Sequence, residues 1–463
     1  MSLKAFKLSA VLISAVVIAA CGQATNEQHT TVAAPAGEPA NTSAHTKKGS
    51  ASFTVVNTAN QDFSNVPLIV NKARLKALGF SFETNTASHP VTIVSTDGGN
   101  SFAGQLDDID QDGQWDELAF VLDTPANSEQ SLTIALGMVA LDDTEKGEQP
   151  MRTNIRFGKY ISSQRSDATE VRALSRMSDG LPADYANQFQ MEGPAWENDN
   201  IGFRLYFDER NGFDIFGKTG ANIVLDSVGI NENYHELQDW GMDILKVGRS
   251  LGSGALAFVD SADSASPVLT RVSNARKTSA EVVLEGPVRS ILDLRYEGLS
   301  NAQGQSLNLN QRISIWAGQH FYSGELTLHN ASAEQGAVAS VSEGSSQSIA
   351  VGIVNLHDAS ANQSVINKHA VLASYKEQAE ENTKLGMAVV TPVSSHLSFG
   401  AVGAADTGVE HSFFNVLSLT PSTSTGYDFY AVWQPRMTNI DSEDAFMQVI
   451  SDDLLRKQSV FIR

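Results

Sequence analysis

The chain of 463 residues contains very little cysteine and comparatively little positive charge. Cys21 is its single cysteine, so no disulfide bond can form within the chain. The 32 Lys and Arg residues are outnumbered by 53 Asp and Glu residues, which gives a formal net charge of −21. An anionic surface repels phosphates and the sequence has no basic cluster, so nucleic acid is not expected as a partner. An anionic sugar polymer stays open, because a small cationic groove can lie on an acidic protein.

Long apolar runs and nucleotide-binding motifs are also missing. Beyond residue 20, no segment is apolar enough to span a bilayer. There is no Gly-x-Ser-x-Gly elbow, no P-loop and no Gly-x-Gly-x-x-Gly after a strand. Serine-nucleophile chemistry, nucleotide hydrolysis and dinucleotide redox chemistry are therefore disfavoured, and no organic cofactor is expected.

The first 20 residues have the character of a targeting signal. Lys4 and Lys7 precede the largely apolar run from Leu8 to Ala20, which is too short to span a bilayer. The run ends directly before Cys21, as in a bacterial lipoprotein signal, so we expect cleavage there and palmitate-type acylation of Cys21 that anchors the protein to a membrane. A glycine at position 22 favours the outer membrane, facing the periplasm or the surface. The alternative is a plain secretory signal with a chance cysteine.

Composition divides the rest of the chain into a tether and two all-β units. Residues 21–50 are rich in Ala, Thr, Pro, Asn and Gly, which indicates a flexible tether. Short apolar or alternating runs follow, which predicts a small β-sandwich over residues 51–150 and a large antiparallel, supersandwich-like β-sandwich over 151–463 with few helices. In residues 306–316, Leu and Ile alternate with polar residues, the pattern of a strand with one buried face. The best helical periodicity lies over residues 234–247, although Gly241 weakens it.

An acidic loop over residues 108–117 is typical of a calcium site. Alternate carboxylates with a glycine at the sixth position supply the oxygens and the turn that Ca²⁺ requires. Ala119 occupies the place of the usual bidentate glutamate, so Glu117 is expected to substitute. The candidate ligands are Asp108, Asp110, Asp112, Asp116 and Glu117. The alternative is an acidic hairpin turn without a metal.

Residues 192–254 interleave polar, aromatic and glycine residues most densely, which is typical of sugar sites. Strand parity in 202–208 places Arg204 and Tyr206 on the face opposite Phe203 and Leu205. His235 is the strongest acid/base candidate because its unperturbed pKa lies near neutrality. The candidate catalytic residues are His235, Tyr206, Arg204 and Tyr234, and the candidate substrate-binding residues are Trp196, Asn198, Asp239, Lys246 and Arg312.

Each candidate also has a purely structural alternative. Arg204 could pair with Asp208 at the surface, Arg312 could pair with Asp293, and Trp196 could pack in the core. The residues His235, Asp239, Asp243 and Lys246 could form an ordinary solvated helix face. A metal site on the first three of these is disfavoured, because no second histidine lies nearby.

Four segments of the sequence resemble the domain-of-unknown-function 4861 family. They are residues 108–117, 192–206, 211–218 and 239–248, and the resemblance extends over nearly all of 52–463. The family consists of secreted or lipid-anchored bacterial proteins commonly found in polysaccharide-degradation systems. The resemblance implies similarity to lyases of uronate-containing polysaccharides such as ulvan.

A lyase would remove H5 of a uronate and expel the sugar linked at C4. This chemistry needs a group that neutralises the carboxylate, a base and an acid. Arg204 or Asn198 is expected to neutralise the carboxylate. His235 is expected to act as the base, and Tyr206 or Tyr234 as the acid. A glycoside hydrolase with two carboxylates stays open, with candidates among Glu192, Glu197, Asp214, Asp239 and Asp243. A non-catalytic glycan-binding lipoprotein is the third possibility.

Overall fold

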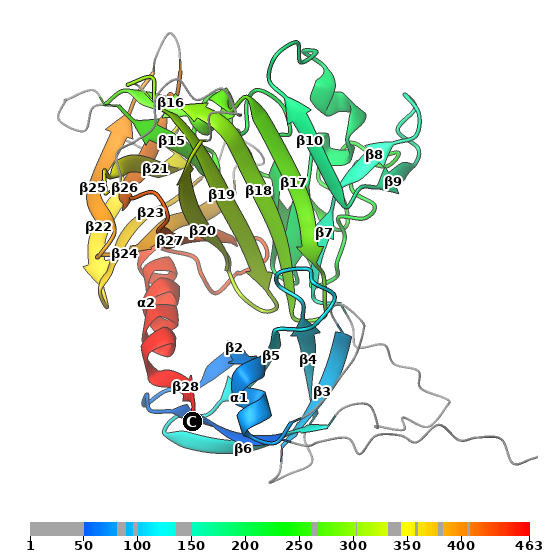
Figure 1. Cartoon of the computed structure of the whole chain (residues 1–463), viewed down its shortest axis with the longest axis vertical. Helices are drawn as coiled ribbons and strands as arrows, with labels where there is room; N and C mark the ends of the chain where they lie inside the picture. The colour runs from blue at the N-terminus through cyan, green and yellow to red at the C-terminus, as the bar shows by residue number, and fades with distance from the viewer. Residues whose placement is uncertain are drawn as a thin grey trace, which may run out of the picture. The chain divides into compact units, whose positions relative to one another are not determined.

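The computed structural model describes most of the chain beyond residue 50 (Figure 1). The described residues are 51–80, 89–95, 101–135, 151–260, 267–301, 303–331, 344–356, 360–377, 383–404 and 408–463. The signal, Cys21, the tether and the polar stretch 142–150 that marked the expected boundary lie outside them. Within the described residues, no helix combines the length and apolar character needed to cross a membrane.

The N-terminal unit is one antiparallel sheet of seven strands, completed by the last strand of the chain. Helix α1 (Lys72–Ala77) follows one of its strands, and Leu75 and Phe80 pack into the core of this sheet together with Trp115. The C-terminal strand β28 pairs with β1, so the two ends of the described chain lie in one sheet. In sheet order, the strands are β2 (Phe63–Asn71), β5 (Glu117–Thr124), β4 (Ser101–Asp107), β3 (His89–Ser95), β6 (Ser128–Ala135), β1 (Ala51–Asn57) and β28 (Val460–Ile462).

A sheet of nine antiparallel strands forms one layer of the larger part. The expected alternation along residues 306–316 is confirmed, because Leu307, Leu309, Ile313 and Ile315 are buried while the residues of the other parity, 308, 310, 312 and 314, are partly or fully exposed. In sheet order, the strands are β10 (Ala173–Met177), β17 (Lys277–Leu284), β18 (Arg289–Ser300), β19 (Ser306–Trp316), β20 (Phe321–Asn330), β27 (Ser424–Trp433), β24 (Lys384–Pro392), β23 (His369–Glu377) and β22 (Asn362–Ile366).

Two sheets of five strands form the opposing layer. One consists of β14 (Gly241–Asp243), β13 (Phe213–Lys218), β12 (Ile201–Leu205), β11 (Ala195–Asn198) and β7 (Thr153–Arg156). The other consists of β16 (Leu269–Arg271), β15 (Ser253–Val259), β21 (Gln347–Val354), β26 (Ser412–Leu419) and β25 (His396–Val402). A two-stranded sheet of β8 (Gly158–Tyr160) and β9 (Ala168–Glu170) and the short 3₁₀ turns η1 (Tyr185–Gln188), η2 (Gln190–Glu192) and η3 (Val272–Asn274) complete this part.

One continuous apolar core joins these layers. It contains Leu292 and Leu309 from the nine-stranded sheet, Phe203 and Ile215 from the first five-stranded sheet, and Val351 from the second. Inward-facing side chains of opposing sheets that share one core define a β-sandwich. The expected all-β class is confirmed.

Helix α2 (Glu443–Ser459) covers part of the outer face of the nine-stranded sheet. Phe446, Ile450 and Leu454 recur every four residues and pack against β23, β24 and β27. Ser442 caps the helix by accepting a hydrogen bond from the Ala445 amide at 3.3 Å. The helix thereby leads the chain from the large sheet back to the N-terminal one (Figure 1).

The expected helix over residues 234–247 is wrong. Residues 231–240 form turns, and residues 241–243 form strand β14. The Asn233 side chain accepts a hydrogen bond from the His235 amide at 3.2 Å, which favours a turn over a helix. Gly241 has a φ of +137°, and a Cβ there would lie 1.8 Å from the Gly217 carbonyl oxygen. The glycine that weakened the helical pattern is therefore required by close strand pairing.

Candidate functional site

Two neighbouring strands bring the polar centre of the site together. In the antiparallel register of β12 and β13, Arg204 lies opposite Asp214. The parity that sends Phe203 and Leu205 into the sandwich core sends Arg204 to the other face of the sheet. Met191, Phe216 and Tyr234 cover that face as a second apolar cluster, so the guanidinium lies inside the protein.

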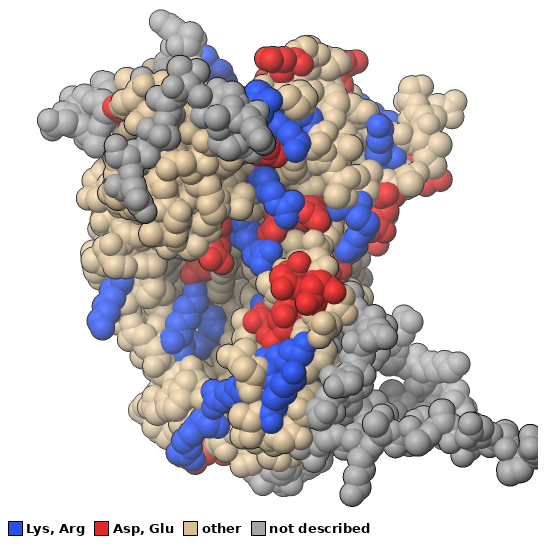
Figure 2. Space-filling model, in the orientation of Figure 1, with Lys and Arg blue, Asp and Glu red and all other residues tan. Residues whose placement is uncertain are grey.

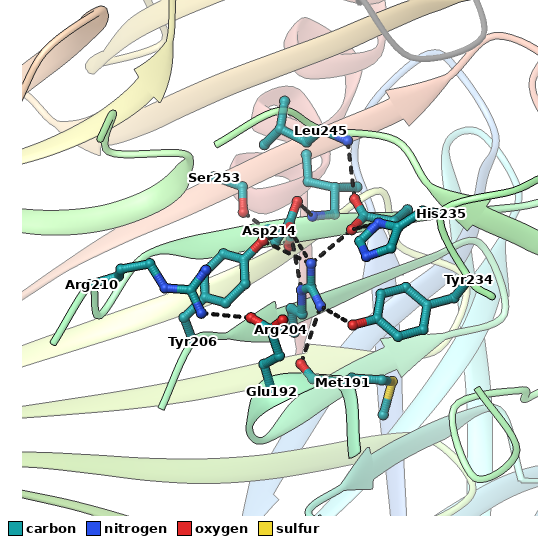
Figure 3. Close-up of polar contacts among 12 residues, drawn as sticks. Met191, Glu192, Arg204, Tyr206, Arg210, Asp214, Tyr234, His235, Leu245 and Ser253 are labelled. Carbon is teal, nitrogen blue, oxygen red and sulfur yellow. Dashed lines mark hydrogen bonds and ion pairs between the residues drawn. The ribbon is translucent and has the colours of Figure 1, made fainter. Parts of the chain in front are cut away.

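Arg204 is the centre of a buried ion-pair cluster (Figure 3). Its Nη2 atom lies 2.6 Å from Oδ2 of Asp214 and 2.7 Å from Oδ2 of Asp243. The same atom donates to the Tyr206 hydroxyl at 2.8 Å, while Nη1 donates to the Tyr234 hydroxyl at 3.1 Å and to the Met191 carbonyl at 3.2 Å. Burial, reinforced by the nearby Asp243 carboxylate, raises the pKa of Asp214 to about 6.

Tyr206 lies between two guanidinium groups. Figure 3 shows Arg210 on one side of its ring and Arg204 on the other, with Cζ atoms 3.8 Å and 4.4 Å from the ring centroid. Arg210 is held in place by ion pairs with Asp208 and Glu192, each at 2.6 Å. The Tyr206 hydroxyl donates to Oδ2 of Asp214 at 2.5 Å. Burial raises the pKa of Tyr206, so the phenol keeps its proton.

His235 lies on the solvent side of this cluster. Its Nδ1 atom is 3.3 Å from Oδ2 of Asp243, the same oxygen that binds Arg204. The His235 side chain is 59% exposed, and its ring contacts the Tyr234 ring in a tilted arrangement at a centroid distance of 4.4 Å. Hydrogen bonding to Asp243 raises the pKa of His235 above its ordinary value, against a smaller opposing effect of partial burial. A carboxylate that orients one imidazole nitrogen leaves the other free for proton transfer.

These groups line an open pocket of about 380 Å³. Its walls are formed by Tyr206, His235, Asp243, Leu245, Lys246, Val247 and Gly248. Lys246 is exposed and makes no hydrogen bond or ion pair with another residue in the part of the chain that the structure describes. The pocket therefore combines an imidazole, a phenol and an ammonium group over a buried carboxylate cluster.

The structure overturns the direct contact expected of Arg204 with a substrate. The Arg204 side chain is only 1% exposed, and its donors are directed at partners within the protein. The surface pairing with Asp208 is equally wrong, since Asp208 pairs with Arg210. Tyr234 is buried against Phe216 and does not line the pocket, so Tyr206 is the tyrosine that lines it.

Trp196 and Asn198 are structural residues, and the prediction that they bind substrate is wrong. Trp196 is fully buried and packs edge-on against Phe213 and Tyr322 in the main core. Asn198 is also fully buried, and its amide donates to the carbonyls of Trp316 at 2.7 Å and Gln319 at 2.8 Å. Trp196 and Asn198 lie two residues apart on β11, so their side chains point to the same face of the sheet, which is the face toward the main core.

Asp239 and Arg312 lie outside the pocket. Asp239 is exposed in the turn before β14 and does not line the cavity. Arg312 lies on β19 of the nine-stranded sheet and donates to Asp293 at 2.7 and 2.8 Å. The structural pairing considered for Arg312 is therefore the correct interpretation, while Lys246 and His235 remain as predicted residues at the pocket.

Asp214 and Asp243 are the residues whose central place the sequence analysis missed. Both entered it only within larger sets of carboxylates. The signal for Asp214 was its parity on 213–218, which matches that of Arg204 on the preceding strand. No local signal identifies Asp243, because its contact with His235 depends on a turn rather than on the expected helix.

Four of the five candidate carboxylates of a hydrolase are already paired, and the fifth, Asp239, does not line the pocket. Glu197 lies 2.5 Å from Lys218 in a fully buried ion pair, and its other oxygen accepts the amides of Val224 and Leu225. Glu192 pairs with Arg210. Asp214 and Asp243 both bind the same nitrogen of Arg204, and Asp214 is completely buried. Two accessible carboxylates facing one another are not found among the described residues of this pocket.

The sequence matches the family described as "Domain of unknown function (DUF4861)" over residues 55–456. The chain belongs to this family. A comparison with curated proteins gave no match.

Among solved structures, an alpha-mannosidase from Enterococcus faecalis V583 has 8% identity and a TM-score of 0.42, covering 89% of this chain and 46% of the mannosidase. A glycosyl hydrolase family 38 protein from Enterococcus faecalis has 8% identity and a TM-score of 0.41, with 90% and 48% covered. The chain spans about half the length of these proteins, and likeness at this level says nothing about activity.

The acidic loop of this DUF4861 chain lies between β4 and β5 of the N-terminal sheet. Carboxylate oxygens of Asp108, Asp110 and Asp116 lie within 4.8 Å of one another, which fits the ligand set of a hard cation. Asp112 does not join this group and accepts the Gln114 amide at 2.8 Å. Glu117 is not part of this group and pairs with Arg289 at 2.6 Å. Three of the five predicted ligands are thus placed to share a cation.

Proposed function

We propose that this protein is a polysaccharide lyase that cleaves a uronate-containing, ulvan-like anionic polysaccharide by β-elimination in the pocket around His235. The observation that carries the proposal is the pairing of an open, carboxylate-oriented imidazole with a phenol in one cavity. Imidazole and phenol are the base and acid that an elimination next to a carboxylate needs.

His235 is the proposed base. With Nδ1 directed at Asp243, its Nε2 atom is free to take H5 from the sugar ring. Because Asp243 raises the pKa of His235, the neutral imidazole is a stronger base than an unperturbed one. The electron pair released from the C5–H bond forms the C4=C5 double bond, and the C4–O bond to the leaving sugar breaks.

Tyr206 is the proposed acid. Its hydroxyl proton, which Asp214 accepts in this structure, turns to the leaving oxygen when substrate is bound and passes to it, so that the expelled sugar departs as an alcohol. The Arg204 guanidinium, 2.8 Å from the phenol oxygen, then stabilises the phenolate until a proton from solvent restores it. This contribution of Arg204 acts through Tyr206 and requires no contact with the substrate.

Lys246 takes over the role first assigned to Arg204. It is the cation that lines the pocket without an internal partner, and an ammonium near the C5 carboxylate stabilises the charge that develops when H5 leaves. On an acidic protein, such a local cation favours an anionic substrate. We also propose, from the sequence alone, that Cys21 is acylated and holds the enzyme at the outer membrane, where such polymers are met.

The ultraviolet absorbance of the C4=C5 double bond tests the proposal. Incubation of the full chain with ulvan, polygalacturonate or alginate should raise this absorbance on one of the three polymers. The substitution His235→Ala should lower the rate by about 10²–10⁴-fold, the usual contribution of a general base. The control His369→Asn changes a histidine on β23 outside the pocket and should leave the rate unchanged.

Other outcomes would identify a different activity. New reducing ends without absorbance would indicate a hydrolase, and polymer retention without cleavage would indicate a binding protein. A His235→Ala variant with the rate of the unsubstituted protein would remove His235 from the mechanism.

A further inference from the structure

A second hollow lies on the opposite side of the nine-stranded sheet from the main core. It has a volume of about 400 Å³. Residues of β2, α1 and β28 line it on the side of the N-terminal unit, and residues of β19, β20 and the C-terminal end of α2 line it on the other side. Figure 2 shows this hollow at the left centre of the view, with Lys and Arg side chains at its margin. We call it the α2 groove. The residues that matter below are Ile69, Arg74, Phe321, Arg456, Lys457 and Phe461.

All charged side chains that line the α2 groove are positive. Arg456 is largely buried and pairs with Asp453. The Nζ atom of Lys457 lies 2.5 Å from Oδ2 of Asp428. Both carboxylates lie outside the lining of the groove. Arg74 donates to the Ile462 carbonyl at 3.0 Å and makes no ion pair with a described carboxylate. In a chain with a net charge of −21, a cavity with only cationic groups is complementary to an anion.

The walls of the groove offer exposed apolar surface next to these cations. Phe461 is 46% exposed and Ile69 is 45% exposed, although both belong to strands. The Lys457 ammonium lies 4.5 Å from the centroid of the Phe321 ring, which keeps the cation beside the apolar wall. An aromatic face beside an arginine is suited to a sugar ring that carries a carboxylate. The sugar ring packs on the aromatic face, and the carboxylate pairs with the arginine.

We propose that the α2 groove is a second saccharide-binding site, which holds an anionic oligosaccharide segment away from the His235 pocket. The choice of a saccharide as ligand rests on the proposed function. Arg74 pairs with a sugar carboxylate, and Phe461 and Ile69 contact the apolar face of the ring. A second site of this kind gives a long polymer two attachment points on one protein, which strengthens binding without any change at the cleavage site.

Affinity electrophoresis of the full chain through gels that contain polygalacturonate tests this site. The His235→Ala background prevents cleavage during the run, and a dextran gel serves as the neutral control. In that background, the double substitution Arg74→Gln and Phe461→Ala should weaken retention about tenfold, the loss expected for a charge-assisted contact. The matched control Lys76→Gln removes an exposed cation of α1 that does not line the groove, and it should leave retention unchanged.

Each result decides the proposal. If retention is lost in the double variant but not in the Lys76→Gln control, the result supports saccharide binding in the α2 groove. Equal retention of all variants, equal loss in the Lys76→Gln control, or no retention of the starting protein overturns it. The result is independent of cleavage: if no polymer gives the absorbance of a double bond but the groove variants behave as expected, only the lyase proposal fails.

Discussion

Two buried arginines organise this protein, and they have different environments. Arg204 binds Asp214 and Asp243 beneath the His235 pocket. Arg289 binds Asp107 and Glu117 where the N-terminal sheet meets β18, and Gln105 accepts its backbone amide at 3.0 Å. In both clusters, one guanidinium neutralises two carboxylates, and burial raises the pKa of Asp107 and of Asp214 to about 6.

The difference between the clusters lies in what covers them. The Trp316 ring covers the Arg289 guanidinium, and the Cζ atom of Arg289 lies 4.9 Å from the ring centroid. Above Arg204, a phenol and an exposed imidazole connect the buried charges to an open cavity. A buried arginine with two carboxylates is therefore a structural unit in both places, and only the titratable groups between it and solvent make one of them a candidate for chemistry.

The largest expected effect comes from removing each arginine. Arg204→Met and Arg289→Met each leave two carboxylates without their cation, which should lower the free energy of unfolding by about 3–5 kcal/mol. The cost should be lower for Arg289, because the Glu117 side chain is 21% exposed and can be solvated. Denaturant unfolding measures both effects, and the absorbance assay on the folded variants should show lost cleavage for Arg204→Met alone. If Arg289→Met abolished cleavage equally, the functional difference between the clusters would be refuted.

A smaller effect is expected in the pH dependence of cleavage. His235 must be neutral to accept H5, so activity rises as the pH passes through its pKa. Asp243 raises that pKa, and Asp243→Asn should therefore move the ascending limb of kcat/KM to lower pH and reduce the maximal rate. Asp239→Asn, an exposed carboxylate of the same turn, is the matched control and should leave the limb in place. An unchanged limb in Asp243→Asn would show that His235 is not the titrating base.

The smallest effect concerns the acidic loop. This loop joins Asp107 and Glu117, the two partners of Arg289, so a bound cation should stabilise that cluster rather than the pocket. We expect Ca²⁺ at about 100 times its Kd to add about 2.7 kcal/mol to the free energy of unfolding, as for any ligand of the native state. Thermal unfolding with and without Ca²⁺ measures this, and Asp110→Asn should remove the response. A Tm that Ca²⁺ does not change would leave the loop as an acidic turn.

The sequence predicted features that depend on neighbours along the chain. Strand alternation identified the all-β class and the buried face of residues 306–316, because side chains of a strand alternate between two faces wherever the strand lies. The same rule separated Arg204 from the apolar face of β12, whereas Tyr206 lies just beyond the strand and packs against the main core. Composition singled out residues 192–254, and all residues that line the His235 pocket lie within this range.

Only the tertiary structure decided whether the polar face of a strand is exposed to solvent or buried. Arg204 lies on the non-core face of its strand, but the cluster around Met191, Phe216 and Tyr234 covers that face and turns an expected substrate contact into a buried support. The contact between His235 and Asp243 arises from a turn stabilised by Asn233 and a strand that only Gly241 permits. Parity fixes the direction of a side chain relative to its own backbone, whereas burial depends on segments that fold onto it from elsewhere in the chain.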